Sequence, residues 1–150
     1  MDATDEALID SVRILLRIMR HLQKVCDQNG ISISQYTTLD WIANHEVTRP
    51  YTIAELNSVS RPAVAALIAG LEKKGLLTRK TVEKDGRGIH LVCTKKSLRL
   101  LQGLEQDLTK RLVEIFGESA DVIAQLAKVD ALVEALDAEV ELDIKRSSQK

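Results

Sequence analysis

Residues 58–75 have the sequence SVSRPAVAALIAGLEKKG, which holds the start, the body and the end of one helix. Ser60 suits the N-cap, and Pro62 falls in the first turn, where an N–H would have no intrahelical partner. The apolar residues fall on one side at about 100° per residue, and they are Val64, Leu67, Ile68 and Leu71. Gly75 stands where helices commonly end on a glycine. These signals predict a helix over residues 60–74.

The opposite side of this helix is made almost entirely of small residues. It comprises Pro62, Ala65, Ala66 and Ala69, with Arg61 and Gly70 at its edges and Lys73 at its end. Such a smooth face either enters a nucleic-acid groove or lets a second helix approach closely, and both interpretations stay open. Arg61 and Lys73 favour a polyanion, because helix packing alone does not explain two flanking cations.

A second short helix is predicted just upstream, over residues 52–57. Two helices that cross closely need a small residue in the first, a tight turn, and an aliphatic residue facing back from the second. Ala54, Ser58 and Val64 have that spacing. The sequence therefore predicts a helix-turn-helix.

Two strand-like segments follow directly. Residues 77–82 and 89–94 alternate in polarity and are rich in β-branched side chains. The connection between them, residues 83–88, contains Asp85 followed by Gly86, which is a strong hairpin signal. The predicted order is therefore helix, turn, helix, hairpin.

An earlier helix is predicted between Ser34, as its cap, and the Arg49-Pro50 pair, which closes it. Its inward-facing residues are expected to be Leu39, Ile42 and Ala43, with Trp41 as a lid over them.

The two ends of the chain have the pattern of long amphipathic helices. A seam of heptad-like spacing runs through residues 5–28, and it consists of Leu8, Val12, Leu15, Met19, Leu22 and Cys26. Arg13, Arg17, Arg20 and Lys24 form a basic stripe beside this seam. A second apolar stripe consists of Leu98, Leu101, Leu104, Leu108, Leu112 and Ile115. The last helix, with Ser119 as its cap, repeats the heptad spacing at Val122, Leu126, Val129, Val133, Leu136 and Val140. Helices of this length need a partner, so a dimerisation layer is favoured over a bundle within one chain.

Composition places the chain among soluble globular proteins. Its 150 residues are 45% hydrophobic, 29% charged and only 3% aromatic. The acidic start does not resemble a signal peptide, and no apolar run approaches a membrane span, so a cytoplasmic protein without a membrane partner is expected. The two cysteines, Cys26 and Cys93, are far apart and are interpreted as buried apolar groups.

Charge is distributed unevenly along the chain. Residues 49–99 contain 11 basic and 4 acidic side chains. By contrast, residues 1–48 contain 4 basic and 7 acidic side chains, and residues 100–150 contain 6 basic and 11 acidic ones. A basic middle between acidic ends is typical of an anion-binding module, although a solvated basic surface gives the same count.

The sequence resembles the MarR family of winged helix-turn-helix transcription regulators over almost its whole length. The resemblance rests on Ile53-Ala54, on Val59 to Pro62 with Val64, on Leu67 to Leu76, on Asp85 to Arg87 and on Thr94. It implies a mainly α fold with a small β-hairpin wing, in which residues 1–34 and 97–150 form the dimerisation layer and residues 35–96 bind DNA. It also implies a homodimer on a palindromic operator, repression, and release by a small, often aromatic or phenolic, ligand. No cofactor is implied.

The residues expected to contact DNA follow from this resemblance and from the exposed face of the helix. They are Ser60, Arg61, Pro62, Ala63, Ala65, Ala66, Ala69 and Lys73, with Lys84, Asp85 and Arg87 in the wing. The sequence departs from the family at Ser58, which replaces a common glycine, and at Ala63, Ala65 and Ala66, which replace hydroxyl and basic residues. Alanine methyls can touch thymine methyls, so specificity shifts towards DNA shape and the wing.

Arg87 is the strongest candidate for sequence preference, since an arginine at a hairpin tip can enter the narrow minor groove of A·T-rich DNA. In the family an aspartate two residues earlier orients this arginine, and Asp85 stands at that position. The alternative interpretation is that Arg87 is only a solvated charge in the turn. Arg87→Ala is expected to weaken DNA binding by about 1 to 3 kcal/mol and to relax the A·T preference. Titration against operators with altered flanks measures both effects, and an unchanged preference would contradict the assignment.

An effector site is predicted from residue type and spacing alone. Arg17 and His21, one turn apart, could hold an aromatic carboxylate together with Trp41, although a dimer-surface charge and a core tryptophan are the simpler alternatives. A redox-responsive regulator acting through Cys26, as in the peroxide-sensing branch of the family, is a further alternative. Only Lys24 would lower the pKa of that thiol, and Asp27 would raise it, which favours a structural role.

Two other classes of protein are less consistent with the sequence. An enzyme is disfavoured because His21, His45 and His90 are scattered and no phosphate loop, nucleophile elbow or metal-ligand spacing occurs. A helical interaction protein that does not bind nucleic acid would use the seams and the alanine face, but it leaves the basic middle unexplained.

Overall fold

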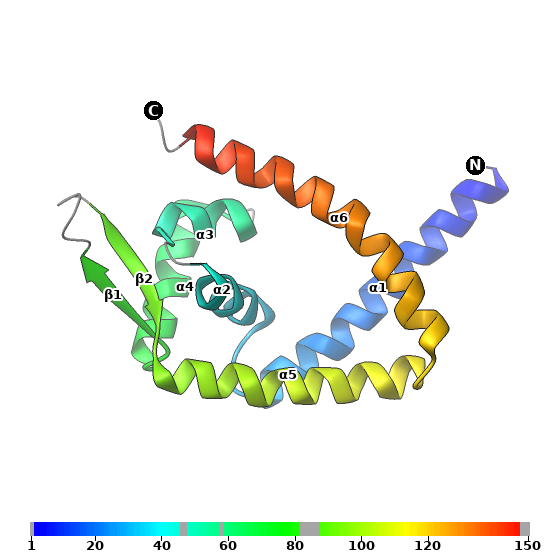
Figure 1. Cartoon of the computed structure of the whole chain (residues 1–150), viewed down its shortest axis with the longest axis horizontal. Helices are drawn as coiled ribbons and strands as arrows, with labels where there is room; N and C mark the ends of the chain where they lie inside the picture. Colours follow the sequence, from blue (N-terminus) through cyan, green and yellow to red (C-terminus); the bar gives the residue numbers. More distant parts are fainter. Residues whose placement is uncertain (1, 46–47, 58, 82–87, 148–150) are drawn as a thin grey trace.

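The computed structural model describes residues 2–45, 48–57, 59–81 and 88–147, with side chains of the last helix described up to Ala138 and at Arg146. Within this part of the chain the order is α1–α2–α3–α4–β1–β2–α5–α6. The fold is mainly helical with one antiparallel hairpin, as predicted (Figure 1).

The first two helices begin at capping boxes. α1 (Ala3–Gln28) starts where the Asp2 carboxylate accepts from the amide of Asp5, and it ends before Gly30, whose φ of 78° suits glycine. α2 (Ile33–Asn44) starts at Ser32 and not at the predicted Ser34. Gln35 decides this choice, because its amide donates to the Ser32 hydroxyl while its side-chain oxygen accepts from the Ser32 amide.

The central helices form the predicted pair, with one boundary moved. α3 (Pro50–Asn57) begins two residues earlier than predicted, since proline is well suited to the first helical position. α4 (Arg61–Lys73) begins at the Ser60 cap, with Pro62 in its first turn, and Gly75 follows it with a φ of 69°. The signals in residues 58–75 therefore predicted this helix correctly.

The hairpin and the last two helices also match their predicted ranges closely. β1 (Leu77–Thr81) pairs antiparallel with β2 (Ile89–Cys93), from Leu77 opposite Cys93 to Thr81 opposite Ile89. Thr94 then caps α5 (Lys95–Phe116), and α6 (Ala120–Ser147) follows Gly117. The Leu91 amide donates to the carbonyl of Thr48 at 2.8 Å, which ties the chain between α2 and α3 to the hairpin.

The core occupies only one end of the molecule. Its buried apolar residues come from the end of α1, from α2, α3, α4 and the hairpin, and from the first half of α5, and include Cys26, Leu39, Ile53, Ile68, Leu71, Leu91 and Leu104. Leu39 and Ile42 point inward as predicted, but Ala43 is exposed because the next helical position turns away from the core. Trp41 is half-buried and packs against the core, which fits a lid.

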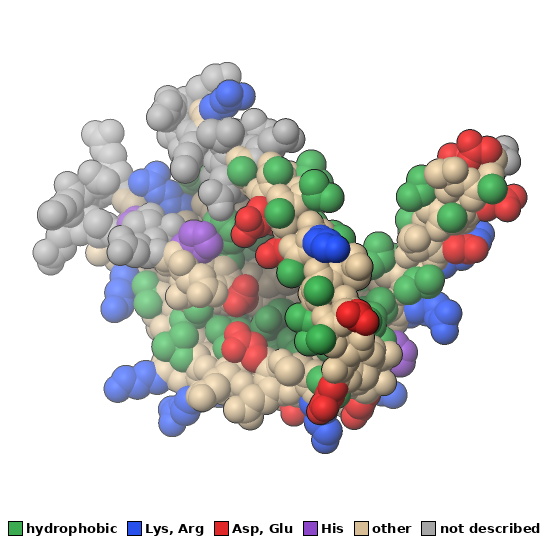
Figure 2. Space-filling model, turned by 45° about the vertical axis from the view of Figure 1, so that its right-hand side comes forward, with side chains coloured by type: hydrophobic (Ala, Val, Ile, Leu, Met, Phe, Trp, Pro, Cys, Tyr) green, Lys and Arg blue, Asp and Glu red, His purple; other side chains and the backbone are tan. Residues whose placement is uncertain are grey.

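The long terminal helices extend beyond this core. The first part of α1 projects away from the rest, and α6 runs back from the end of α5 towards α3 (Figure 1). Hydrophobic side chains line the projecting arm and the helix in front of it (Figure 2). The exposed members of the two predicted seams are Leu8, Val12, Leu15 and Met19 in α1 and Leu126, Val129, Val133 and Leu136 in α6. Among the described residues, none of the helices is long and apolar enough to cross a membrane.

Candidate nucleic-acid interface

The crossing of α3 and α4 is held by hydrogen bonds as well as by packing. The Asn57 side-chain amide donates to the carbonyl of Ile53 at 3.0 Å and to the hydroxyl of Thr38 at 3.3 Å. The Val59 amide donates to the carbonyl of Ala54 at 3.2 Å, so the chain turns directly after α3. These contacts fix the direction of α4 relative to α2 and α3. Ser58, the predicted turn residue, lies outside the described residues.

The predicted contact face of α4 is open to solvent. Val64, Ile68 and Leu71 are buried on the inner side, as predicted. The exposed residues are Ser60, Arg61, Pro62, Ala63, Ala65, Ala66, Ala69 and Lys73. The structure thus brings eight of the predicted contact residues onto α4 and its N-cap. The other three, Lys84, Asp85 and Arg87, lie outside the residues that the structure describes.

Some charges of the basic middle hold the fold together. The Lys74 ammonium donates to the carbonyl of Gly30 at 2.8 Å, and the Lys96 ammonium donates to the carbonyl of Lys74 at 2.7 Å. Arg79 pairs with Glu72, with an Nη2–Oε1 distance of 2.8 Å. These three cations are therefore engaged, and the count of 11 basic residues overstates the charge left for an anion.

The cations next to the α4 face are not engaged in this way. For Arg49, Arg61 and Lys73 the structure records no hydrogen bond or ion pair with any residue it describes. Arg61 is exposed at the first position of α4, where the free N–H groups of the helix end also favour an anion. Phosphate oxygens are suitable partners for such a helix start.

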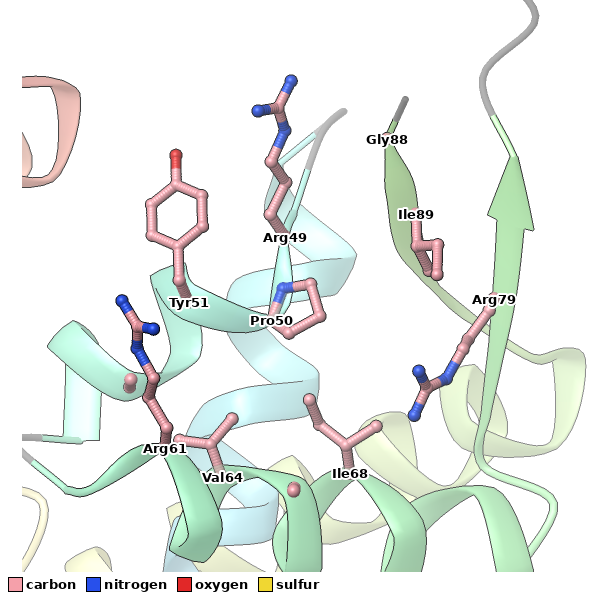
Figure 3. Close-up of a pocket in the computed structure, with 11 residues that line it drawn as sticks. Arg49, Pro50, Tyr51, Arg61, Val64, Ile68, Arg79, Gly88 and Ile89 are labelled. Carbon is pink, nitrogen blue, oxygen red and sulfur yellow. The ribbon is translucent and has the colours of Figure 1, made fainter. Parts of the chain in front are cut away.

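A pocket of about 580 Å³ lies beside this face, between α3, α4 and the hairpin. Arg49, Tyr51 and Arg61 stand on one side of it, and Arg79 reaches in from β1 on the other (Figure 3). Sequence reasoning missed Arg49, Tyr51 and Arg79 as site residues, and it assigned Arg49 only to the end of a helix. The signal available was the run Arg49-Pro50-Tyr51 at the start of α3, in the basic third of the chain.

The predicted effector residues fall in two separate places. Arg17 and His21 line a shallow pocket of about 230 Å³ on α1, together with Arg20 and Lys24. Trp41 does not line it; its ring stacks on His45, with centroids 3.7 Å apart. The Arg111 guanidinium lies 3.4 Å from Nδ1 of His21.

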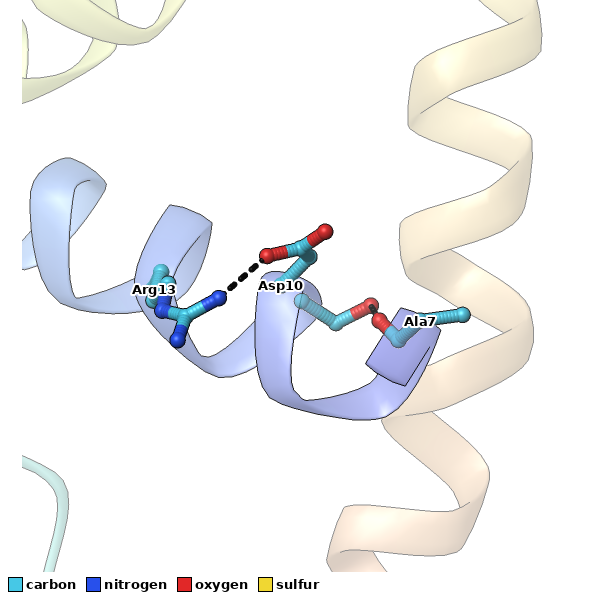
Figure 4. Close-up of polar contacts among 4 residues, drawn as sticks. Ala7, Asp10 and Arg13 are labelled. Carbon is cyan, nitrogen blue, oxygen red and sulfur yellow. Dashed lines mark hydrogen bonds and ion pairs between the residues drawn. The ribbon is translucent and has the colours of Figure 1, made fainter. Parts of the chain in front are cut away.

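The rest of the α1 basic stripe is partly neutralised. Arg13 pairs with Asp10 at 2.6 Å on the outer surface of the helix (Figure 4). Both side chains are more than half exposed, so this pair contributes little to stability. The positive charge that remains free on α1 therefore lies towards its second half, around the Arg17 pocket.

Both thiols are in surroundings that raise their pKa. Cys26 is fully buried, and burial raises its pKa, with Asp27 raising it further. Burial also raises the pKa of Cys93, whose Sγ lies 3.5 Å from the carbonyl of Leu39. Among the described residues, no group of three or more His, Cys, Asp or Glu side chains could hold a metal ion.

A helix-turn-helix with a solvent-facing second helix and a hairpin directly behind it defines the winged-helix class. Comparison with known proteins agrees with this assignment to the winged-helix class. The MarR family model matches residues 29–88, which begin directly after α1 and end directly before β2. The HTH-type transcriptional regulator ML2140 of Mycobacterium leprae is 23% identical over 141 residues, which cover 91% of this chain and 97% of that protein.

Solved structures extend the similarity to the terminal helices. AbsC, a MarR family regulator from Streptomyces coelicolor, superposes with a TM-score of 0.74 at 19% identity, covering 92% of this chain and 97% of that one. CouR from Rhodococcus jostii, bound to p-coumaroyl-CoA, superposes with a TM-score of 0.72 at 16% identity, covering 93% of this chain and 95% of that one. The chain is thus a winged-helix protein that is similar to the MarR family of DNA-binding transcription regulators.

Proposed function

We propose that the protein is a homodimeric repressor that places α4 of each copy in the major groove of a palindromic operator in the cytoplasm. The observation that carries this proposal is the exposed face of α4, whose small residues are flanked by Arg61 and Lys73, two cations that pair with none of the described residues. A face without bulky side chains lets the helix enter deeply, while the cations meet phosphates on either side. The wing residues Lys84, Asp85 and Arg87 would read the adjacent minor groove.

The division of labour along the chain is part of the same proposal. Residues 35–96 bind DNA, and residues 1–34 and 97–150 join the two copies. The exposed leucines of α1 and α6 support it, because Leu15 is 64% exposed and Leu126 51% exposed in a single chain. Exposed apolar stripes of this length normally mark an interface.

Selection of genomic fragments with the purified protein tests this function. We expect recovery of a palindromic site whose half-site centres are about 34 Å apart, one turn of DNA. Binding should weaken steeply as salt is raised, because phosphate contacts release counterions. Fragments recovered without any shared motif, or binding that ignores salt, would contradict the proposal.

A small ligand is proposed to release the repressor. CouR shows that a chain of this fold holds an aromatic thioester. In the present protein Arg17 and His21 remain the proposed effector residues; Trp41 would have to act from a separate position. A thermal-shift screen of aromatic acids and their thioesters tests the site, with Arg17→Gln as the variant that should abolish any stabilisation.

Peroxide is not expected to release the protein from DNA. Cys26 is fully buried and its pKa is raised, so little thiolate exists at neutral pH to react. Fluorescence anisotropy with labelled operator, before and after peroxide, should give the same Kd, and thiol titration of the folded protein should find Cys26 unmodified. Loss of binding that a Cys26→Ser variant resists would instead establish the redox alternative.

A further inference from the structure

The second half of α1 carries a group of basic side chains, called here the α1 basic cluster. Its members line one shallow pocket of about 230 Å³, and they are Arg17, Arg20, His21 and Lys24. We propose that this cluster binds a linear chain of phosphates, as found in a nucleoside triphosphate or in inorganic polyphosphate. This inference names a different class of ligand for the proposed effector site, and it rests on the proposed function only in treating that site as one for effectors.

The α1 basic cluster faces away from the apolar seam that is proposed to join two copies. At about 100° per residue, its members are centred about 160° around the helix from Leu8, Val12, Leu15 and Met19. A partner helix that packs on this seam therefore leaves the cluster uncovered. Basic side chains lie on the outer side of the lower part of the projecting helix (Figure 2). All four members of the cluster are exposed, so a soluble ligand can reach them.

The positive charge of the cluster is not neutralised by the part of the chain that the structure describes. Arg13 pairs with Asp10, but Arg17, Arg20 and Lys24 form no ion pair with any described residue. None of the described residues that line the pocket is acidic. Like charges three or four residues apart on a helix destabilise it. The grouping therefore has a cost in stability that a bound anion would offset.

A contact from α5 leaves His21 able to donate a hydrogen bond to the ligand. The Arg111 guanidinium lies 3.4 Å from Nδ1 of His21, and because a guanidinium can only donate, Nδ1 accepts. The neutral imidazole then carries its proton on Nε2. Glu114 pairs with Arg111 through an Nε–Oε2 distance of 3.0 Å, which holds the guanidinium in place. All four side chains of the cluster thus offer a donor to an anion.

The spacing of the cluster favours an extended anion over a compact one. Arg17 and Lys24 are separated by about 10 Å along the helix axis, and Arg20 lies between them. A single carboxylate can contact only one end of this row, such as Arg17 and His21. A chain of linked phosphates can contact its whole length, and phosphate oxygens are well suited to arginine and lysine.

Calorimetry with the full-length protein, in buffer free of divalent cations, tests the proposal. We expect saturable binding of tripolyphosphate, binding of pyrophosphate weaker by about fivefold, and no binding of orthophosphate. Citrate is a compact anion with several carboxylates, and it should bind at least about tenfold more weakly than tripolyphosphate. Citrate binding as tight as tripolyphosphate, or affinity that does not change with chain length, would overturn the proposal.

ATP distinguishes the two sources of the phosphate chain. An affinity for ATP above that for tripolyphosphate would support a nucleotide, because the base and sugar then add contacts. Equal affinities would support inorganic polyphosphate, because the protein then reads the phosphates alone.

Variants separate the α1 basic cluster from the DNA-binding face. The double variant Arg20→Gln with Lys24→Gln should weaken tripolyphosphate binding by about tenfold or more. Arg99→Gln, an exposed arginine of α5 outside the pocket, should change nothing, and neither should Arg61→Gln on α4. All these positions are exposed, so the variants should fold like the wild type. Binding that Arg61→Gln removes and the double variant keeps would overturn the proposal and place the phosphates on the α4 face.

Operator binding distinguishes failure of this proposal from failure of the proposed function. A protein that binds its operator but not tripolyphosphate would overturn the ligand assignment alone. A protein that binds tripolyphosphate through the α1 basic cluster and no operator would overturn the proposed function and leave the site standing.

Discussion

Ala69→Glu is expected to weaken operator binding by about 3 kcal/mol, roughly a hundredfold in Kd. Ala69 lies in the middle of the exposed face of α4. Glutamate there would place a long side chain between the helix and the groove and a negative charge beside the phosphates. Fluorescence anisotropy with labelled operator at one fixed salt concentration measures the effect.

The fold should tolerate this substitution. An exposed alanine replaced by glutamate in a helix costs only a few tenths of a kcal/mol of helix propensity, so thermal unfolding should be nearly unchanged. Gln102→Glu is the matched control, because it adds the same charge at an exposed position of α5. We expect that variant to bind the operator almost as tightly as the wild type.

Equal affinity of Ala69→Glu and the wild type would mean that α4 does not enter DNA. The remaining interpretation of the smooth face is then close packing against another helix. A change in the oligomeric state of Ala69→Glu, measured by light scattering, would identify that case.

Much of the fold could be predicted because its signals are local. In α4 the cap at Ser60, the apolar spacing and Gly75 lie within one short stretch and agree with one another. The boundary errors came from competition between neighbouring signals. Two serines offered a start for α2, and the reciprocal bond from Gln35 decided for Ser32.

The site was predictable only where one element supplies it. The α4 face follows from the helical period, so its residues could be listed from the sequence. The adjacent pocket joins Arg49 and Tyr51, at the start of α3, to Arg79 of β1, and only the fold brings these two elements together. Long-range contacts also decide which cations are free, as the bond from Lys74 to the carbonyl of Gly30 shows.

Leu126→Asp is expected to convert the proposed dimer into monomers and to weaken operator binding by at least about a hundredfold. Leu126 belongs to the apolar seam of α6 and is 51% exposed in a single chain. Aspartate would introduce a charge that the interface would have to bury without a partner. Two joined copies bind adjacent half-sites at high effective concentration, and separate copies lose that advantage.

Sedimentation velocity gives the mass of each variant, and anisotropy gives its affinity for full and half operators. Ala131→Asp is the matched control, since it puts the same charge on an exposed position of α6 away from the seam. The affinity of Leu126→Asp for a half operator should equal that of the wild type, because α4 and its surroundings are untouched. A Leu126→Asp protein that stays dimeric would show that the α6 seam is not the contact between copies, and the α1 seam around Leu15 would then have to hold the two copies together.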